Sequence, residues 1–213
     1  MNLHQFKRTK HMIDLDLLPA VSSKDVIRVV DAGASYGEFM TELVSVCSPF
    51  KIMLLCLEPS RRAIEKLKEE QKKIDFYDIA IMPLALSHKG GERVKFTEFV
   101  GVNGKYHQWG NITGSYERQA RNRKDFIKFN RYEVKTTSLD DIAVAPIDYL
   151  KMDIEGAEYD ILKHATPEIM SNIRQLSMEY HDPESYKWCE KKLTDLGFKT
   201  VIRKKEEIYA ARI

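Results

Sequence analysis

Long apolar runs are missing from this sequence of 213 residues, of which 31% are charged. Five charged side chains break up the apolar residues within positions 1–20, so neither a signal peptide nor a membrane span is expected there. Cysteine is scarce too, because Cys47, Cys56 and Cys189 are the full set and form no C-x-x-C pair. That spacing excludes a disulfide framework and a cysteine zinc site, and it favours buried thiols in a reducing compartment. A cytoplasmic protein is therefore predicted.

A charge excess of either sign is also absent, since the formal net charge is only +2. The near balance provides no global field directed at nucleic acid or a membrane surface, and nucleic acid is not expected as a partner. Internal repeats and low-complexity segments are lacking. With 43% hydrophobic residues, the chain can bury one sizeable core. We expect a single domain over 1–213, with residues 1–25 as an N-terminal helical arm.

The dinucleotide fingerprint G-x-G-x-x-G is missing at the place where it would be expected. β-branched residues within 26–30 predict a buried parallel strand that ends at Asp31, and helical spacing of apolar residues begins soon afterwards. The connecting loop contains Gly33 and Gly37, but Ser35 stands at the middle glycine position. Because that glycine lets the backbone approach a pyrophosphate, its absence favours a smaller ligand without phosphates. Glycines and a new helix N-terminus still suit a nucleoside-like ligand.

The rest of the chain alternates strand and helix patterns. Apolar β-rich runs predict strands at 51–57, within 75–87, at 94–100, 147–153 and 175–181, and a hairpin at 198–202 and 208–211. Periodic helical patterns follow most of these strands. The connection 203–207 is so short that the last two strands must be antiparallel. The predicted fold is α/β: a Rossmann-like three-layer sandwich with a mostly parallel seven-stranded sheet and a C-terminal antiparallel hairpin.

Residues 101–131 form the least regular stretch of the sequence. They contain seven Lys or Arg against two acidic residues, with Tyr106, Trp109 and Tyr116 among them. Long irregular insertions are often functional lids, and aromatic rings beside arginines would suit a sugar, a phosphorylated acceptor or a nucleic acid. A solvated charged loop is the alternative interpretation. This basic insertion is a candidate substrate lid.

Polar residues follow the ends of several predicted strands. Glu58 ends the second strand, where a carboxylate accepts two hydrogen bonds from ribose hydroxyls in α/β nucleotide sites, and Pro59 fixes the backbone just beyond it. Near the exit of the third strand, Ala85, Leu86 and Ser87 are candidates for the wall around a flat aromatic ring.

The fourth and fifth strands end in a second group of candidates. Asp153 and Glu155 follow one strand, and Glu179 and His181 follow the other. Each pair has i, i+2 spacing, which places both members on one side of an extended chain. Because neighbouring parallel strands end at the same edge of a sheet, the two pairs are expected to face one cleft.

A specific run connects these blocks to a known family. Thr137-Ser138-Leu139-Asp140-Asp141 followed by Ile147–Glu158 resembles the hallmark of the FkbM family of S-adenosylmethionine-dependent methyltransferases. Val30–Gly37, Glu58-Pro59, Ala85-Leu86-Ser87 and Glu179-Tyr180-His181 fall where that family has matching blocks, so the resemblance covers residues 27–182. Ser35 departs from the asparagine that the family often has, but it keeps a polar group. The 104–131 region matches no pattern of the family.

The resemblance implies that S-adenosyl-L-methionine is the cofactor and that a hydroxyl of a sugar, glycan or other small molecule is methylated. It further assigns a role to each matching position. The methionine part of the cofactor would lie against Asp31, Gly33, Ala34, Ser35 and Gly37. Glu58 would hold the ribose, Ala85, Leu86 and Ser87 would border the adenine, and Asp153 and Glu155 would lie beside the cofactor.

An alcohol is a poor nucleophile and needs a base or a metal ion to take its proton. Our hypothesis assigns the base to His181 or Asp153, with Glu155 and Glu179 orienting groups around it. A divalent cation held by these carboxylates and His181 is a less favoured variant, and no metal ligand is assigned. As structural alternatives, Glu179 and His181 would form a hydrogen-bonded pair beneath the cleft, and Glu158 would stabilise the first turn of its helix.

Three competing functions remain open at this stage. The basic insertion is compatible with an RNA ribose methyltransferase, although Lys151 is expected to point into the sheet. A nicotinamide-dependent oxidoreductase is disfavoured by the missing middle glycine. A non-catalytic nucleoside-binding module would retain the same fold. Parallel binding measurements with S-adenosylmethionine, a nicotinamide dinucleotide and RNA would separate these functions.

Overall fold

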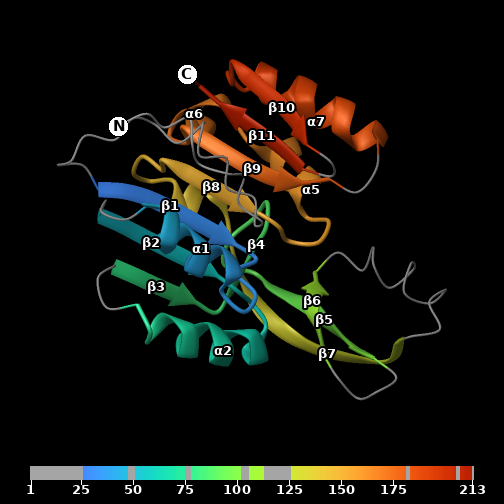
Figure 1. The fold of residues 1–213 in the computed structure, drawn as a ribbon. Helices are drawn as coiled ribbons and strands as arrows, with labels where there is room; N and C mark the ends of the chain where they lie inside the picture. Colours follow the sequence, from blue (N-terminus) through green and yellow to red (C-terminus); the bar gives the residue numbers. More distant parts are fainter. Residues whose placement is uncertain are drawn as a thin grey trace.

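The computed structural model describes residues 26–47, 51–74, 78–101, 106–112, 126–180, 183–204 and 207–212. A seven-stranded sheet runs through the molecule in the order β10-β11-β9-β8-β1-β2-β3 (Figure 1). Its strands are β1 (Val26–Ala32), β2 (Lys51–Leu57), β3 (Asp78–Met82), β8 (Tyr149–Met152), β9 (Gln175–Glu179), β10 (Thr200–Lys204) and β11 (Glu207–Ala211). The first five of these strands are mutually parallel, whereas β11 runs antiparallel to both of its neighbours. The α/β fold is thus built on a mixed sheet.

Apolar residues on alternate positions of the central strands bury both faces of this sheet. In β1, Ile27 and Val29 belong to one core cluster and Val30 belongs to the other. This alternation follows from the two-residue repeat of a strand, and it explains why the run is apolar almost throughout.

Helices cover each face. Phe39 of α1 (Glu38–Cys47) and Leu67 of α2 (Arg61–Gln71) pack into the cluster on one face. The opposite face is covered by four helices that contribute to the other cluster: α4 (Leu139–Ile142), α5 (Glu158–His164), α6 (Pro167–Ser171) and α7 (Pro183–Asp195). Burial of these apolar faces provides most of the favourable free energy of folding.

A second sheet of four strands, in the order β4-β7-β5-β6, lies beyond the carboxyl ends of the parallel strands (Figure 1). It consists of β4 (Leu84–Leu86), β5 (Arg93–Gly101), β6 (Tyr106–Asn111) and β7 (Phe126–Thr137). This sheet was not predicted from the sequence. Residues 78–86, expected as one strand and its exit, are split into strands of two different sheets, and 106–111 and 126–131 of the irregular stretch belong to β6 and β7.

The split of 78–86 falls at Pro83. Proline has no N–H to donate to a sheet ladder, so the chain leaves the first sheet after Met82 and pairs with β7 from Leu84 onward. The lengthening of β7 into the predicted insertion follows from its pairing with β5, which continues from Arg93 to Gly101.

Local signals for helix starts are confirmed. The hydroxyl of Ser60 accepts a hydrogen bond from the Ala63 N–H at 3.1 Å, and Ser138 forms a capping box with Asp141, whose carboxylate accepts the Ser138 N–H at 2.9 Å. The predicted terminal hairpin is also present as β10 and β11.

Among the described segments, none of the helices has the length and apolar character that a membrane crossing requires. The predicted arm at 1–25, part of the predicted lid and His181 lie outside the described residues.

Candidate functional site at the carboxyl ends of the parallel strands

The loop between β1 and α1 is held between two other strands. Gly33 has φ +79°, and its N–H donates a hydrogen bond to the Leu57 carbonyl at the end of β2, 2.9 Å away. A Cβ atom on Gly33 would lie 1.8 Å from the Asp153 carbonyl oxygen just after β8. Only glycine fits this position, because it combines a left-handed backbone with direct backbone contact.

Ser35 occupies a left-handed conformation as well, with φ +49°. Glycine and asparagine adopt this conformation more readily than serine does. The Ser35 N–H points to the neighbouring strand end and donates a hydrogen bond to Glu58 Oε2 at 2.8 Å. The left-handed backbone at Ser35 thus directs its N–H to the carboxylate that ends the neighbouring strand.

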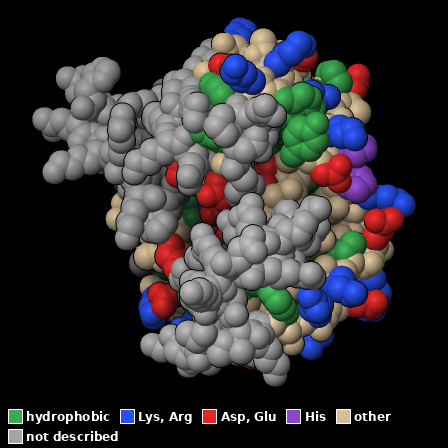
Figure 2. Space-filling view, turned by 90° about the vertical axis from the view of Figure 1, so that its right-hand side faces the viewer, with side chains coloured by type: hydrophobic (Ala, Val, Ile, Leu, Met, Phe, Trp, Pro, Cys, Tyr) green, Lys and Arg blue, Asp and Glu red, His purple; other side chains and the backbone are tan. Residues whose placement is uncertain are grey.

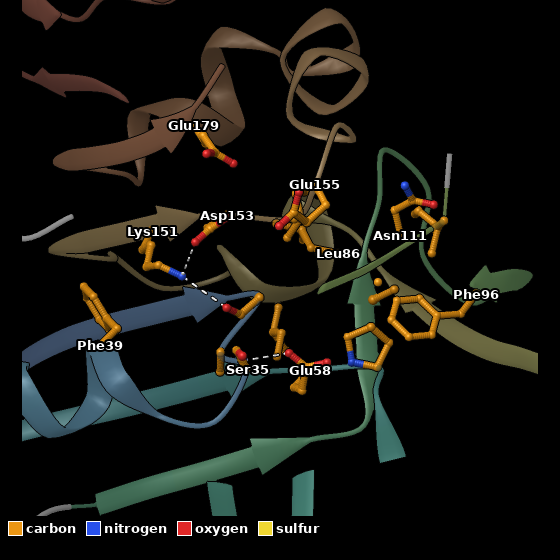
Figure 3. Close-up of a pocket in the computed structure, with 18 of the residues that line it drawn as sticks. Ser35, Phe39, Glu58, Leu86, Phe96, Asn111, Lys151, Asp153, Glu155 and Glu179 are labelled. Carbon is orange, nitrogen blue, oxygen red and sulfur yellow. Dashed lines mark hydrogen bonds and ion pairs between the residues drawn. The ribbon is translucent and has the colours of Figure 1, made fainter. Parts of the chain in front are cut away.

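Glu58 is buried at the end of β2. Its other oxygen, Oε1, accepts the Ser60 N–H at 2.7 Å, so the carboxylate joins the β1–α1 loop to the start of α2 (Figure 3). Burial raises the pKa of Glu58 to about 7, although the two backbone hydrogen bonds act in the opposite direction. This carboxyl group thus changes its protonation near neutral pH.

A second buried acid fastens the small sheet to this region. Glu98 on β5 accepts hydrogen bonds from the Ser60 hydroxyl at 2.6 Å, the Tyr132 hydroxyl at 2.7 Å and the Asn130 amide at 3.2 Å. Ser60 therefore caps α2 and also contacts β5. The network holds the four-stranded sheet against the ends of the parallel strands.

Asp31 and Lys151 form a buried ion pair below the loop. Lys151 Nζ lies 3.0 Å from Asp31 Oδ1, 3.1 Å from the Gly33 carbonyl oxygen and 3.6 Å from Asp153 Oδ2. Burial by itself lowers the pKa of Lys151, but the carboxylates of Asp31 and Asp153 outweigh this effect and raise the pKa above its ordinary value. A permanently charged amine cannot accept a proton, so Lys151 acts as an electrostatic anchor.

The loop between β8 and α5 has an unusual backbone. Glu155 has φ +59° and Gly156 has φ +104°, so two successive residues are left-handed. Glu158, the first residue of α5, is 2% exposed, and its carboxylate accepts the N–H groups of Ile154 and Gly156, both at 2.8 Å. Glu158 thereby fixes the loop that positions Glu155, beyond the helix-start role that the sequence suggested.

These elements enclose a cavity of about 350 Å³, within the size range of small-molecule and cofactor sites. The first sheet contributes residues from the loops after β1, β2, β8 and β9, and the second sheet contributes Ala85, Leu86, Phe96 and 110–112. Acidic side chains dominate the charged part of the lining: Glu38, Glu58, Asp153, Glu155, Glu179 and Glu207, against Lys151. Figure 2 shows Asp and Glu side chains gathered in a hollow on the face that the strand ends share.

Most residues predicted for the site line this one cavity. They are Gly33, Ala34, Ser35, Glu58, Pro59, Ala85, Leu86, Asp153, Glu155 and Glu179. Asp31 lies behind the wall and is fully buried, Gly37 borders a separate surface groove, and Ser87 is not part of the lining. His181 lies outside the described residues, so its predicted role stays a prediction.

Ten of the lining residues were not among those predicted, and four of these ten bear on the chemistry of the cavity. Phe96 and Asn111 come from the unpredicted sheet, and Glu207 comes from the hairpin, where it pairs in register with Glu179. Lys151 was expected to point into the sheet, and it is buried, but its amine borders the cavity. The sequence contained a signal only for Lys151, in its i, i+2 relation to Asp153.

Asn111 has unmet hydrogen-bonding capacity. The residue is 1% exposed, and within the described part of the chain neither its amide nitrogen nor its amide oxygen has a hydrogen-bond partner. A buried amide without partners is costly, and such groups often mark a missing ligand or water.

Three carboxylates on the other side of the cavity lie close together. Asp153, Glu155 and Glu179 can each present one oxygen so that the three oxygens lie within 4.8 Å of one another. This arrangement can accept a proton or hold a hard cation.

Comparison with solved structures shows a similar fold in an FkbM methyltransferase. An FkbM methyltransferase from Methylobacillus flagellatus KT has a TM-score of 0.56 and 17% identity over 88% of this chain, which spans 44% of that protein. The N-terminal domain of human METTL16 in complex with SAH gives a TM-score of 0.45 at 12% identity, covering 91% of this chain and 64% of that one. An rRNA methylase from Streptococcus thermophilus gives 0.45 at 10% identity, covering 89% and 88%.

A comparison with curated protein sequences finds no match. In contrast, the profile of the methyltransferase FkbM domain matches residues 31–203. That range runs from Asp31, at the end of β1, to the final hairpin, and it includes the loops after β1, β2, β8 and β9 that form the cavity. The chain therefore belongs to the FkbM family of methyltransferases.

Proposed function

We propose that this chain binds S-adenosylmethionine in the cavity and transfers its methyl group to a hydroxyl of a sugar, glycan or other small molecule. The observation that supports this most directly is that one cavity of about 350 Å³ has a buried carboxylate at the end of β2 and a group of partly exposed carboxylates at the ends of β8 and β9. Glu58 is buried and held by backbone N–H groups, whereas Asp153, Glu155 and Glu179 are partly exposed. The buried carboxylate suits binding of the cofactor, and the partly exposed carboxylates suit transfer of a proton from the acceptor.

The residues present fit such a cofactor. The backbone at Gly33–Ser35 has no side chain larger than a serine, so a ligand can approach the main chain closely. The Glu58 carboxylate would accept both ribose hydroxyls. Ala85, Leu86 and Phe96 offer an apolar wall to the adenine, and the unmet amide of Asn111 favours a polar heterocycle at this wall.

The acidic lining also suits the charge of the cofactor. S-adenosylmethionine contains a sulfonium and an ammonium group. Among the residues that the structure describes, six carboxylate side chains against one amine line the cavity and favour a negative potential there. A polyanionic acceptor would be repelled by the same potential. This charge pattern favours a neutral or cationic acceptor over RNA.

The bound cofactor would supply an electrophilic methyl group for an in-line displacement. The protein contributes by orienting the acceptor oxygen and by taking its proton. Asp153 is held by Lys151 at 3.6 Å, and Glu155 is fixed by the loop that Glu158 stabilises. We assign the base to Asp153 or His181 and the orientation of the acceptor to Glu155 and Glu179.

Calorimetry tests the ligand assignment. Titrations of the purified chain with S-adenosylhomocysteine, a nicotinamide dinucleotide and an RNA oligonucleotide should give saturable binding only for the first. Binding of RNA that weakens steeply with added salt would instead support the RNA ribose reaction. The absence of any nucleoside binding would overturn the proposal.

Screening for transfer follows the binding experiment. Hydroxylated acceptors are incubated with methyl-labelled S-adenosylmethionine, with and without a chelator. Turnover that persists with the chelator removes the variant in which a divalent cation on the three carboxylates is needed. A Glu65→Gln variant is a suitable control, because Glu65 is exposed on α2, away from the cavity lining.

A further inference from the structure

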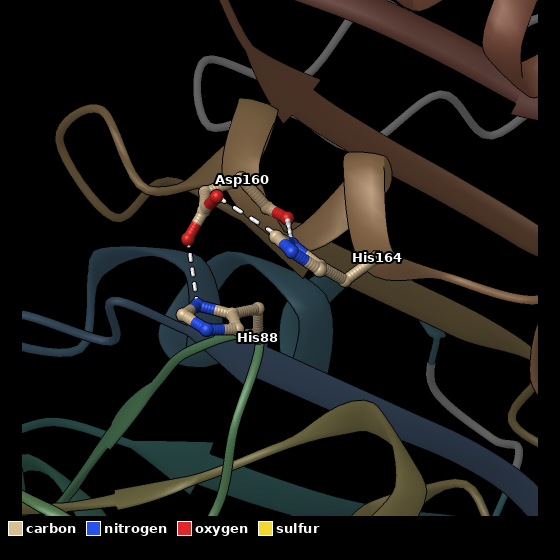
Figure 4. Close-up of side chains that lie close together, drawn as sticks. All are labelled: His88, Asp160 and His164. Carbon is tan, nitrogen blue, oxygen red and sulfur yellow. Dashed lines mark hydrogen bonds and ion pairs between the residues drawn. The ribbon is translucent and has the colours of Figure 1, made fainter.

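A compact group of potential metal ligands lies outside the cavity lining. His88 follows β4, and Asp160 and His164 stand one turn apart on α5. The two imidazole rings are stacked with centroids 4.5 Å apart. Asp160 joins them: Oδ2 lies 2.6 Å from His88 Nδ1, and Oδ1 lies 3.5 Å from His164 Nδ1 (Figure 4).

The geometry is close to that of a bound transition-metal ion. Each of the three side chains can present one ligand atom so that these atoms lie within 4.8 Å of one another. Ligands that share one zinc ion at about 2.0–2.2 Å lie roughly 3–4 Å apart. The side chains of His88, Asp160 and His164 are 37%, 46% and 47% exposed. Small side-chain rotations can therefore bring the ligand atoms to these distances without moving the core.

Two further features favour a metal ion over a simple ion-pair cluster. Asp160 and His164 have the i, i+4 spacing by which one helix face presents two ligands to a zinc ion. In addition, His164 Nδ1 lies 2.8 Å from the Asp160 carbonyl oxygen. When Nδ1 donates its proton to that carbonyl, Nε2 retains its lone pair, and this is the usual arrangement of a metal-bound histidine.

We propose that His88, Asp160 and His164 form a binding site for Zn²⁺, with water completing the coordination. The two imidazole nitrogens are borderline ligands, which suit Zn²⁺, Ni²⁺ and Co²⁺ better than Mg²⁺ or Ca²⁺, and a carboxylate oxygen is a common third ligand of Zn²⁺. Nothing in this proposal depends on methyl transfer. It concerns a surface distinct from the three carboxylates of the cavity.

The ion would connect two segments that border the cavity. His88 directly follows Ala85-Leu86-Ser87, and α5 begins with Glu158, which fixes the loop carrying Glu155. Cross-linking the two segments stabilises the folded state, because the metal binds the native arrangement and not the separated ligands. We therefore expect Zn²⁺ to raise the melting temperature.

The experiment uses the full chain without an affinity tag and after chelator treatment. Zn²⁺ binding is measured by competition with a chromophoric chelator, and Co²⁺ serves as a spectroscopic probe of coordination. We expect one ion per chain and a rise in melting temperature. His88→Ala and His164→Ala should each weaken binding by at least the roughly 10-fold that loss of an outer-shell partner costs, and should abolish the rise.

Two controls make the result specific. Glu65→Gln removes an exposed carboxylate on α2, which covers the opposite face of the sheet from α5, and should leave Zn²⁺ affinity unchanged. Glu179→Gln removes a ligand from the rival group of carboxylates and should also leave it unchanged. The proposal is overturned if the His88→Ala/His164→Ala double variant binds Zn²⁺ as tightly as the unmodified chain, or if Glu179→Gln is the variant that loses binding.

Discussion

The two ends of the cavity carry the same chemical group in opposite settings. At the β2 end, Glu58 is 6% exposed and each of its oxygens accepts a backbone N–H. At the β8 end, the Asp153 side chain is 36% exposed and contacts an amine. A carboxylate fixed by backbone groups recognises a ligand geometrically, whereas a partly solvated one exchanges protons. Burial, and not residue type, therefore distinguishes the proposed ribose-binding carboxylate from the proposed proton acceptor.

The largest effect on stability is expected where the β1–α1 loop contacts the end of β8. Gly33→Ala places a Cβ 1.8 Å from the Asp153 carbonyl oxygen at a φ of +79°, and it should cost roughly 2–5 kcal/mol of unfolding free energy. Gly91→Ala is the matched control, because Gly91 has a φ of +76° but nothing lies within 4 Å of its Cβ position. Denaturant unfolding of this control should show a loss of only about 1–2 kcal/mol of unfolding free energy. Equal losses in the two variants would contradict the close contact.

The carboxylates of the β8 and β9 ends should affect rate and not cofactor affinity. Loss of a general base typically costs about 10²- to 10⁴-fold in kcat. We expect this loss for Asp153→Asn when Asp153 is the base, and a smaller loss of turnover for Glu155→Gln and Glu179→Gln, which orient the acceptor. Calorimetry should show unchanged affinity for S-adenosylhomocysteine in all three variants. If all three variants retain full turnover, the base is elsewhere, and His181→Ala becomes the next variant to measure.

Glu58→Gln should show the reverse pattern. A glutamine oxygen can replace only one of the two acceptors and is uncharged, so affinity for S-adenosylhomocysteine should fall about 10- to 100-fold. Turnover at saturating cofactor should change much less. A variant that loses kcat at unchanged affinity would remove the distinction between the two ends.

Affinity should also depend on pH through Glu58, whose pKa is raised to about 7 by burial. Ribose hydroxyls require the ionised carboxylate as acceptor, so below pH 7 binding must release a proton. Affinity is therefore expected to fall by up to about tenfold per pH unit as the pH decreases below 7. Calorimetric titrations between pH 5.5 and 8 test this, and Glu58→Gln should flatten the profile.

The same pKa shift determines how stability depends on pH in the absence of ligand. The folded state holds the Glu58 proton up to about pH 7, whereas the ordinary pKa is 4.5. This stabilising contribution is therefore complete below pH 4.5 and is lost as the pH rises through 7. Relative to Glu58→Gln, unfolding free energy should decline by about 3 kcal/mol across that window. A constant difference between the two proteins would show that Glu58 is ionised throughout.

The smallest effect is expected at Ser35. Asparagine adopts its φ of +49° more readily and donates the same backbone N–H to Glu58. Ser35→Asn should leave cofactor affinity unchanged and alter unfolding free energy by less than about 1 kcal/mol. A large loss of affinity would instead assign the serine hydroxyl a direct role in binding.

Local patterns predicted a large part of the fold. Several of its features depend only on neighbours in sequence: the β-branched run at 26–30, the helix caps at Ser60 and Ser138, and the short connection before β11. The second sheet could not be predicted in the same way, because β4 pairs with a strand about 50 residues later. Phe96 and Asn111 were missed as cavity residues for the same reason, and Glu207 was missed because its place opposite Glu179 depends on the pairing of β11 with β9.

The sequence alone was sufficient for the α/β order, for the two groups of carboxylates at strand ends and for the family of the chain. Those features are encoded in short runs whose backbone preferences act within a few residues. Only the tertiary structure decided which carboxylate is buried and which is partly exposed, that Lys151 is anchored between Asp31 and Asp153, and that Asn111 borders the cavity. Burial and charge pairing arise from contacts between distant segments, and the pKa of Glu58 follows from them.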